Sequence, residues 1–261
     1  MTSGPASIWL VGAGNMGGAM LRRWVASGID PATITVIDPI DPRMPDGVTL
    51  VQVPPVGSPD VLVLAVKPQM LDTLPRIGAT MLISILAGVE EASLAQRFDA
   101  GSIVRAMPNL PVDIAKGVVA LHTASRDPAV RARAEALMAP LGLVEWISDE
   151  ALFHTVTALS GSGPGFVYRF IEALAEAGTA LGLPADQAQR FAIATVEGAA
   201  ALAEQAGEAP AALAERVASP GGTTRAGLNV LDRGDAMKRL IAETLTAAAD
   251  RSAEMADAAR R

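Results

Sequence analysis

The sequence contains no cysteine and only two histidines, His122 and His154, and these absences exclude several kinds of site. Disulfides, thiol nucleophiles and thiolate metal ligands cannot occur. The two histidines lie in unrelated sequence contexts, so we predict no metal site, because zinc requires several Cys or His ligands close together. A chain without cysteine is compatible with a reducing compartment, and we expect a cytoplasmic location.

Aromatic residues and long apolar runs are also scarce. Only 3% of the residues are aromatic although 50% are hydrophobic, so the core must be built from Ala, Val, Leu, Ile and Met. No run of about 18 apolar residues lacks a charge or a breaker, and no basic stretch precedes an early apolar run, so neither a membrane span nor a secretory signal is predicted. The net charge is -7 without a cluster of basic residues, and we expect no nucleic-acid partner.

The first half of the chain alternates short β-branched runs with stretches of helical periodicity. Strands are expected over residues 7–11, 33–38, 48–53, 60–66, 81–85, 102–106, 118–121 and 144–147. Helices are expected over residues 15–27, 68–74, 90–98 and 128–141. Such alternation is typical of βαβ units, so we predict an α/β domain over residues 1–150, with a mostly parallel sheet covered on both faces.

The second half has a different pattern. After residue 149 no convincing strand remains, and Ala, Leu, Glu and Arg recur at helical spacing. Helices are expected over residues 150–159, 165–181, 184–206, 209–218, 223–232 and 235–256. We therefore predict an all-α domain over residues 151–261.

A glycine-rich turn follows the first expected strand and opens the first expected helix. In such a turn the glycines permit a tight bend, a close approach of the backbone to pyrophosphate and close packing of helix on strand. The helix N-terminus offers free N–H groups and the positive end of its dipole to the phosphates. A dinucleotide site is thus predicted at Gly12, Gly14, Asn15, Met16 and Gly17.

Asp38 ends the second expected strand, at the distance where an acidic side chain accepts hydrogen bonds from the adenosine ribose. Its charge favours NADH, because a ribose 2'-phosphate would meet a carboxylate at short range. Arg43 could instead pair with that phosphate, so the cofactor is NADPH or NADH. The proline-rich segment 39–47 is shorter than a usual crossover, which predicts that the helix after Asp38 is missing or a single turn.

Four further motifs, together with the glycine-rich turn, resemble those of the pyrroline-5-carboxylate reductase family. They are Val-Lys-Pro at 66–68, Arg-Ala-Met-Pro-Asn at 105–109, Ala-Leu-Ser-Gly-Ser-Gly-Pro at 158–164, and Ser-Pro-Gly-Gly-Thr-Thr at 219–224 with Ala-Gly-Leu at 226–228. The last two are much more specific than the dinucleotide turn, and the resemblance spans roughly residues 7–250. Departures from the family pattern are the short segment after Asp38, Leu110 in place of the common Thr, and Gly165-Phe166 in place of Ala-Tyr.

This resemblance implies a fold, a reaction and a set of site residues. The family has an N-terminal Rossmann domain and a helical C-terminal domain that interlocks with a second subunit, and higher assemblies of dimers are common in it. It reduces the cyclic imine of pyrroline-5-carboxylate to proline, the last step of proline biosynthesis, with NADPH or NADH. The resemblance adds to the cofactor site Ala65, Lys67, Pro68 and Asn109. It assigns the substrate to Ser219, Gly221, Gly222, Thr223 and Thr224, with Lys67 and Thr224 as the catalytic residues.

The chemistry of the substrate gives the Ser-Pro-Gly-Gly-Thr-Thr segment independent support. Its glycines and threonines open a helix whose unpaired N–H groups suit a carboxylate, and Ser219 adds a hydroxyl donor. Without the resemblance, a loop with a helix cap would be the more usual interpretation. A protonated imine accepts hydride readily, so the main task is to place the nicotinamide against the imine carbon. Thr224 then orients the ring nitrogen or helps to protonate it.

Two other functions stay open. A β-hydroxyacid dehydrogenase or imine reductase shares the glycine-rich turn, but such dehydrogenases carry a catalytic Lys on an interdomain helix, and the expected helical domain has only Lys238. A non-catalytic dinucleotide sensor needs only the first motif, whereas motifs for both cofactor and substrate are present. Glu150 and His154 are possible acids, although a charged or aromatic helix residue is more often structural.

Overall fold

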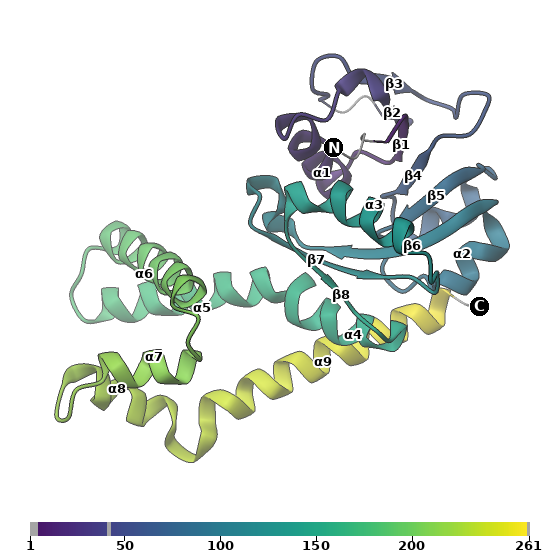
Figure 1. Cartoon of the computed structure of the whole chain (residues 1–261). Coiled ribbons are helices and arrows are strands. Elements are labelled where there is room, and N and C mark those ends of the chain that lie inside the picture. Colours follow the sequence, from purple (N-terminus) through teal and green to yellow (C-terminus); the bar gives the residue numbers. More distant parts are fainter. Residues whose placement is uncertain (1–4, 41–42, 260–261) are drawn as a thin grey trace. The chain divides into compact units, whose positions relative to one another are not determined.

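The computed structural model describes residues 5–40 and 43–259, in which eight strands form one sheet (Figure 1). The strands are β1 (Ile8–Val11), β2 (Ile34–Ile37), β3 (Thr49–Val51), β4 (Val61–Leu64), β5 (Ala79–Ser84), β6 (Ala100–Pro108), β7 (Gly117–His122) and β8 (Gly142–Trp146). The helices are α1 (Asn15–Ala26), α2 (Glu91–Arg97), α3 (Pro128–Met138), α4 (Phe153–Val156), α5 (Gly163–Ala180), α6 (Ala185–Ala206), α7 (Pro210–Val217), α8 (Thr223–Leu231) and α9 (Ala236–Ala259).

The sheet has the order β3-β2-β1-β4-β5-β6-β7-β8. All neighbouring pairs are parallel except β6 and β7, so the prediction of a mostly parallel sheet is confirmed. The chain reverses its direction of travel across the sheet between β1 and β4. In an open α/β sheet a ligand binds outside the carboxyl ends of the strands at such a reversal.

The central strands β1 and β4 are buried along their whole length, which explains why both are apolar without interruption. Along β1, Ile8 and Leu10 pack in the same core cluster as residues of α1 and α3. Trp9 and Val11 point to the opposite face and pack with residues of α2 and the segment before β5. The Trp24 indole N–H of α1 donates to the Leu137 carbonyl of α3 at 2.8 Å, which fixes these two helices to each other.

Two connections bear on the sequence predictions. No helix lies between β2 and β3 among the described residues, as predicted, and Asp41 and Pro42 of this connection lie outside them. The expected helix over 68–74 is wrong in type, because Pro68–Thr73 (η2) is a 3-10 helix with Pro at its start. A six-residue segment closes few i→i−4 bonds, so the tighter i→i+3 pattern competes well there.

The expected helix over 150–159 is divided into three short pieces. A 3-10 turn, Glu150–Leu152 (η5), leads into α4, which continues as a π-helix over Thr157–Gly161 (η6). The Ser162 N–H donates to the Thr157 carbonyl at 2.8 Å, five residues back, as a π-helix requires. π-Helical turns are rare and occur frequently at functional sites.

The chain forms two compact units, of which one is residues up to Ser162 with the chain from Ala248 on, and the other is Gly163–Ala247. The expected boundary near residue 150 follows the change in composition after β8. In the packing, the next residues stay with the sheet, where Phe153 and Ala158 are buried. The end of α9 belongs to the same unit, where Ser252 is buried and accepts or donates a hydrogen bond at His154 (3.0 Å).

The helical unit, residues 163–247, leaves much of its apolar surface exposed. α5 packs on α6 through small residues, and a Cβ placed on Gly178 would lie 3.5 Å from the Ala188 Cβ. A groove of about 710 Å³ lies along these two helices. Large apolar side chains with more than two fifths of their surface exposed include Val167, Tyr168, Phe170, Phe191, Ile193, Leu202 and Leu240. In the part of the chain that the structure describes, no helix is long and apolar enough to span a membrane.

Candidate active site

The glycine-rich turn between β1 and α1 requires glycine at two positions, because a side chain there would collide with neighbouring backbone atoms. Gly12 has a φ of +91°, and a Cβ there would lie 2.8 Å from the Ala65 carbonyl oxygen at the end of β4. A Cβ on Gly17 would lie 2.2 Å from the Gly12 carbonyl oxygen and 3.1 Å from the Ala65 Cβ. The first glycine thus permits the bend, and the last lets α1 start directly against β1 and β4.

The N-terminus of α1 is open to a ligand. Gly14 is the N-cap residue, no side chain caps the helix, and a Cβ on Gly14 would meet no atom within 4 Å. The first N–H groups of a helix have no partner within it, so those of Asn15 and Met16 face outward with the positive end of the helix dipole. The turn and helix therefore present unpaired N–H groups at the carboxyl end of β1, an arrangement that suits an anion.

Asp38 follows β2 and is directed toward this turn. Its carboxylate accepts hydrogen bonds from the backbone N–H groups of Ala13 (2.8 Å) and Ile40 (3.0 Å). The side chain is half-buried and is thereby fixed beside the glycine-rich turn. Arg43 is exposed and forms no ion pair with the described residues.

The carboxyl end of β4 brings the next predicted residues to the same edge of the sheet. Ala65 is half-buried against Gly12 and Gly17, and its N–H donates to the Val11 carbonyl at 2.8 Å. Lys67 is exposed, and its ammonium forms no ion pair among the described residues. Pro68 then starts η2, so the Val-Lys-Pro segment turns sharply away from the strand.

Asn109 follows β6, and its side chain is bonded within the protein. The residue is only 7% exposed. Its amide oxygen accepts from the Val118 N–H at 2.8 Å, and its amide nitrogen donates to the Ser160 carbonyl at 3.0 Å. The amide therefore connects the carboxyl end of β6 to β7 and to the π-helix η6.

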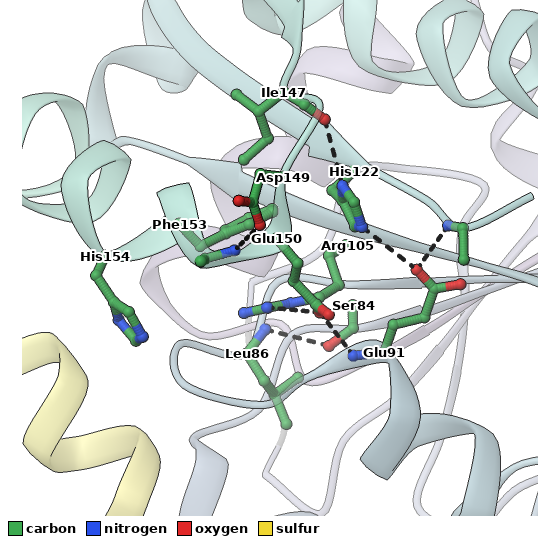
Figure 2. Close-up of polar contacts among 12 residues, drawn as sticks. Ser84, Leu86, Glu91, Arg105, His122, Ile147, Asp149, Glu150, Phe153 and His154 are labelled. Carbon is green, nitrogen blue, oxygen red and sulfur yellow. Dashed lines mark hydrogen bonds and ion pairs between the residues drawn. The ribbon is translucent and has the colours of Figure 1, made fainter.

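A buried ion pair beside this strand was missed by sequence reasoning (Figure 2). Arg105, 4% exposed, donates to a Glu150 carboxylate oxygen at 2.7 Å, and its guanidinium carbon lies 4.2 Å from the centre of the Phe153 ring. The same oxygen of Glu150 accepts from the Glu91 N–H at 2.8 Å. Glu150 is thus engaged in holding η5 and α4 against β6 and α2. The only sequence signal was an arginine within an otherwise apolar strand.

Glu91 lies at the edge of this network, and burial raises the pKa of its carboxyl. Smaller opposing effects come from the Ala124 N–H, which donates to the carboxylate at 2.8 Å, and from His122. His122 lies 3.9 Å from the same carboxylate, and its other ring nitrogen is 3.2 Å from the Ile147 carbonyl. These contacts all join elements of the sheet unit. The cluster therefore holds those elements together, and its polar groups are bonded to one another.

The Ser-Pro-Gly-Gly-Thr-Thr segment forms the turn between α7 and α8 in the helical unit. Gly221 has a φ of +73°, which favours glycine, and Gly222 is the N-cap of α8 without any side-chain cap. A Cβ on Gly222 would lie 2.6 Å from the Ser219 hydroxyl oxygen, so a larger residue there would displace that hydroxyl. Thr223 and Thr224 are exposed in the first turn of the helix. The segment thus presents free N–H groups and hydroxyls together.

Arg225, in the first turn of α8, bonds to residues that precede the turn at 219–224. Its guanidinium pairs with the Glu215 carboxylate of α7, with one N–H···O distance of 3.2 Å, and lies 3.5 Å from the Ala218 carbonyl oxygen. The pairing lowers the pKa of Glu215 and raises that of Arg225. The two ends of the turn are therefore tied together by one side chain.

The predicted residues fall into two groups, one in each unit. The sheet unit brings the predicted cofactor residues to the carboxyl ends of β1, β2, β4 and β6: Gly12, Gly14, Asn15, Met16, Gly17, Asp38, Ala65, Lys67, Pro68 and Asn109. The helical unit brings together Ser219, Gly221, Gly222, Thr223 and Thr224. Across residues 5–40 and 43–259, no group of three or more His, Cys, Asp or Glu side chains is arranged to hold a metal ion.

Comparison with protein families matches each half of the chain separately. Residues 150–255 match the model described as pyrroline-5-carboxylate reductase dimerisation. Residues 7–88 match the model described as NADP oxidoreductase coenzyme F420-dependent. The first match contains the turn at 219–224, and the second contains the glycine-rich turn and Asp38.

Individual proteins match over nearly the whole chain. The pyrroline-5-carboxylate reductase of Pseudomonas aeruginosa is 34% identical over 96% of this chain and 97% of its own length. That of Synechocystis is 41% identical over 75% of each chain. A pyrroline-5-carboxylate reductase structure from Coxiella burnetii aligns with a TM-score of 0.86 and 33% identity, over 96% of this chain and 98% of that one. The Plasmodium falciparum pyrroline carboxylate reductase with NADP bound aligns with a TM-score of 0.79 and 23% identity, over 96% and 98%.

Proposed function

Because the chain belongs to the pyrroline-5-carboxylate reductase family, we propose that it reduces pyrroline-5-carboxylate to L-proline with hydride from NADPH or NADH. Hydride from the nicotinamide joins the imine carbon, a proton joins the nitrogen, and the oxidised dinucleotide is released. The observation that supports this most is the presence, in one chain, of two uncapped helix N-termini, at the glycine-rich turn and at the turn 219–224. A reductase of an anionic imine needs an anion site for each reactant.

The cofactor is assigned to the sheet unit, in the predicted domain 1–150. The pyrophosphate binds the N–H groups at Gly14, Asn15 and Met16, where α1 starts without a cap. The adenosine ribose binds Asp38, and the nicotinamide half extends past Ala65 and Pro68 toward the end of β6. Lys67, which has no ion-pair partner among the described residues, supplies a positive charge at this edge, beside the reacting groups.

The substrate is assigned to the turn at 219–224, in the predicted domain 151–261. Its carboxylate binds the free N–H groups of Thr223 and Thr224, with the Ser219 hydroxyl as a further donor, while the Gly222 N–H donates to the Ser219 carbonyl within the turn. Gly221 gives the turn the left-handed residue that it needs. The Thr224 hydroxyl faces the ring nitrogen and orients it. The site then needs no strong acid, since a protonated imine accepts hydride directly.

The chain forms a homo-oligomer, which its match to a dimerisation model supports. We assign it a homodimer built from the helical unit, and dimers can then associate further. The exposed apolar side chains of α5 and α6 support this assignment, because contiguous apolar surface of this kind marks association sites. The cytoplasm is the proposed location, consistent with a chain that has no cysteine.

The direct test follows the loss of reduced-nicotinamide absorbance with purified protein and pyrroline-5-carboxylate, with NADH and NADPH in separate runs. Rapid oxidation that requires the imine, with proline as the product, is the expected result. If folded protein binds dinucleotide but oxidises neither cofactor, the assignment to this imine fails. Dinucleotide binding measured with and without a proline analogue then separates a reductase of another imine from a sensor, because a sensor does not respond to the analogue.

A further inference from the structure

Asn109 is a node of hydrogen bonds at the carboxyl end of β6. Its backbone N–H donates to the Val118 carbonyl at 3.2 Å, and its side-chain oxygen accepts from the Val118 N–H at 2.8 Å. Its backbone carbonyl accepts from the Val112 N–H at 3.2 Å. The side-chain nitrogen donates to the Ser160 carbonyl of the π-helix η6 at 3.0 Å.

The Ser160 carbonyl lacks its usual α-helical donor. In an α-helix it would accept from the N–H four residues on, but that residue is Pro164, which has no N–H. The helix is already widened here, since the Ser162 N–H bonds five residues back to Thr157. The amide of Asn109 supplies the donor that Pro164 lacks, and it ties the π-helix η6 to β6 at the same time.

The position of this contact relates it to the cofactor. In the strand order of this sheet, the first mononucleotide half lies over β1 to β3, where Asp38 stands, and the second over β4 to β6. Asn109 follows β6, so η6 is held at the nicotinamide end. We infer that Asn109 is a positioning residue that fixes η6 beside the nicotinamide, and does not bind the cofactor through its amide. This inference rests on the proposed function for the identity of the reaction.

Two variants separate positioning from binding. Asn109→Asp keeps an oxygen for the Val118 N–H but places a second oxygen against the Ser160 carbonyl. Asn109→Leu has a similar volume, lacks both side-chain bonds and adds no charge. Both are expected to lower kcat about ten- to a hundredfold, because a small displacement at the reacting centre is costly. The Kd for NADPH or NADH, from cofactor fluorescence, is expected to change less than about threefold.

Thr123→Val is the matched control. The Thr123 hydroxyl is buried and donates at 2.6 Å to the carbonyl of Ile103, which lies in β6, the strand that precedes Asn109. Ile103 is five residues before Pro108, the last residue of that strand. Loss of the hydroxyl also leaves a carbonyl of β6 without that donor, but away from the carboxyl end of the strand. We expect Thr123→Val to lower Tm as the Asn109 variants do, with kcat within about twofold of the parent.

Hydrogen exchange of the Ser162 amide gives a readout that does not depend on turnover. Faster exchange in both Asn109 variants, but not in Thr123→Val, is expected. A cofactor Kd that rises in proportion to the loss of kcat would show that the amide binds the cofactor, and unchanged kcat or unchanged exchange would also overturn the inference. If the parent protein does not reduce the imine, the proposed function fails. Hydrogen exchange of the Ser162 amide and the Kd for the cofactor then still decide whether Asn109 holds η6.

Discussion

At the scale of single residues, Asp38 has a carboxylate whose position is set by the backbone. The N–H groups of Ala13 and Ile40 both donate to it, and these two bonds fix the orientation of the carboxylate. A ribose hydroxyl can donate to such a carboxylate, whereas a 2'-phosphate meets a like charge. In the described part of the chain, Arg43 forms no ion pair that would hold it near this position. We therefore predict that Asp38, if it binds the ribose as proposed, favours NADH over NADPH.

Asp38→Asn should shift this preference toward NADPH. Asn keeps an acceptor for the Ala13 N–H and removes the negative charge. We expect the ratio of kcat/KM with NADPH to that with NADH to rise about tenfold, which corresponds to ~1.4 kcal/mol. Asp46→Asn removes the same charge from an exposed position of the same connection and should leave the ratio within about twofold. Equal ratios in both variants would mean that Asp38 does not face the ribose.

A substitution at Thr224 tests the proposed substrate site at the turn 219–224. Thr224→Val removes the hydroxyl and keeps the shape, so the loss of a hydrogen bond to a charged group, about 1.5–3 kcal/mol, should lower kcat/KM for the imine about ten- to a hundredfold. Thr244→Val, in which an exposed hydroxyl of α9 loses its bond to the Leu240 carbonyl, should change kcat/KM little. Unchanged turnover in Thr224→Val would remove Thr224 from the mechanism.

At the scale of elements, the sequence was sufficient wherever one local pattern decided the structure. The central strands β1 and β4 are short apolar runs buried on both faces of the sheet, so they could be recognised directly. The segment 150–161 could not, because its division into η5, α4 and η6 depends on contacts with β6. Arg105 reaches Glu150 and Asn109 reaches Ser160 from that strand. A sequence contains no local signal for such pairs.

The turn at 219–224 was recognised by resemblance, but the side chain that holds it was not. Arg225 lies in the first turn of α8, where a positive charge opposes the helix dipole, so it needs a partner. Glu215 of α7 supplies that partner and is ten residues earlier in the chain. The pair is exposed and contributes little to stability, but it fixes the spacing of α7 and α8 on either side of the turn.

Arg225→Met should therefore weaken substrate binding more than it weakens the fold. We expect KM for the imine to rise about five- to tenfold with kcat nearly unchanged, the signature of lost binding in both ground and transition states. Arg216→Met, on α7, breaks a comparable exposed pair with Glu208, which precedes that helix, and should leave KM within about twofold. A rise in KM of the same size in Arg216→Met would mean that the turn is not held by Arg225 in particular.

At the scale of the whole molecule, the two units differ in how they bury apolar surface. The sheet unit buries many large aliphatic residues in its core, whereas the helical unit buries mainly alanines, Ala188, Ala192 and Ala218. The composition predicted this outcome in part, since helices rich in Ala and Leu with few aromatics pack closely but form a small core. The return of α9 to the sheet unit could not be predicted, because Ser252 and Ala256 look like ordinary exposed helix residues in the sequence.

The exposed apolar side chains of the helical unit should be covered in the oligomer. Tyr168 is 58% exposed and lines the groove along α5 and α6, so a charge at this position would have to be desolvated on association. We expect Tyr168→Glu to convert the oligomer to monomers at micromolar concentration, as measured by light scattering during size-exclusion chromatography. Gln205→Glu adds the same charge at an exposed polar position of α6 and should keep the parent mass. A Tyr168→Glu protein with the parent mass would place the association surface elsewhere on the unit.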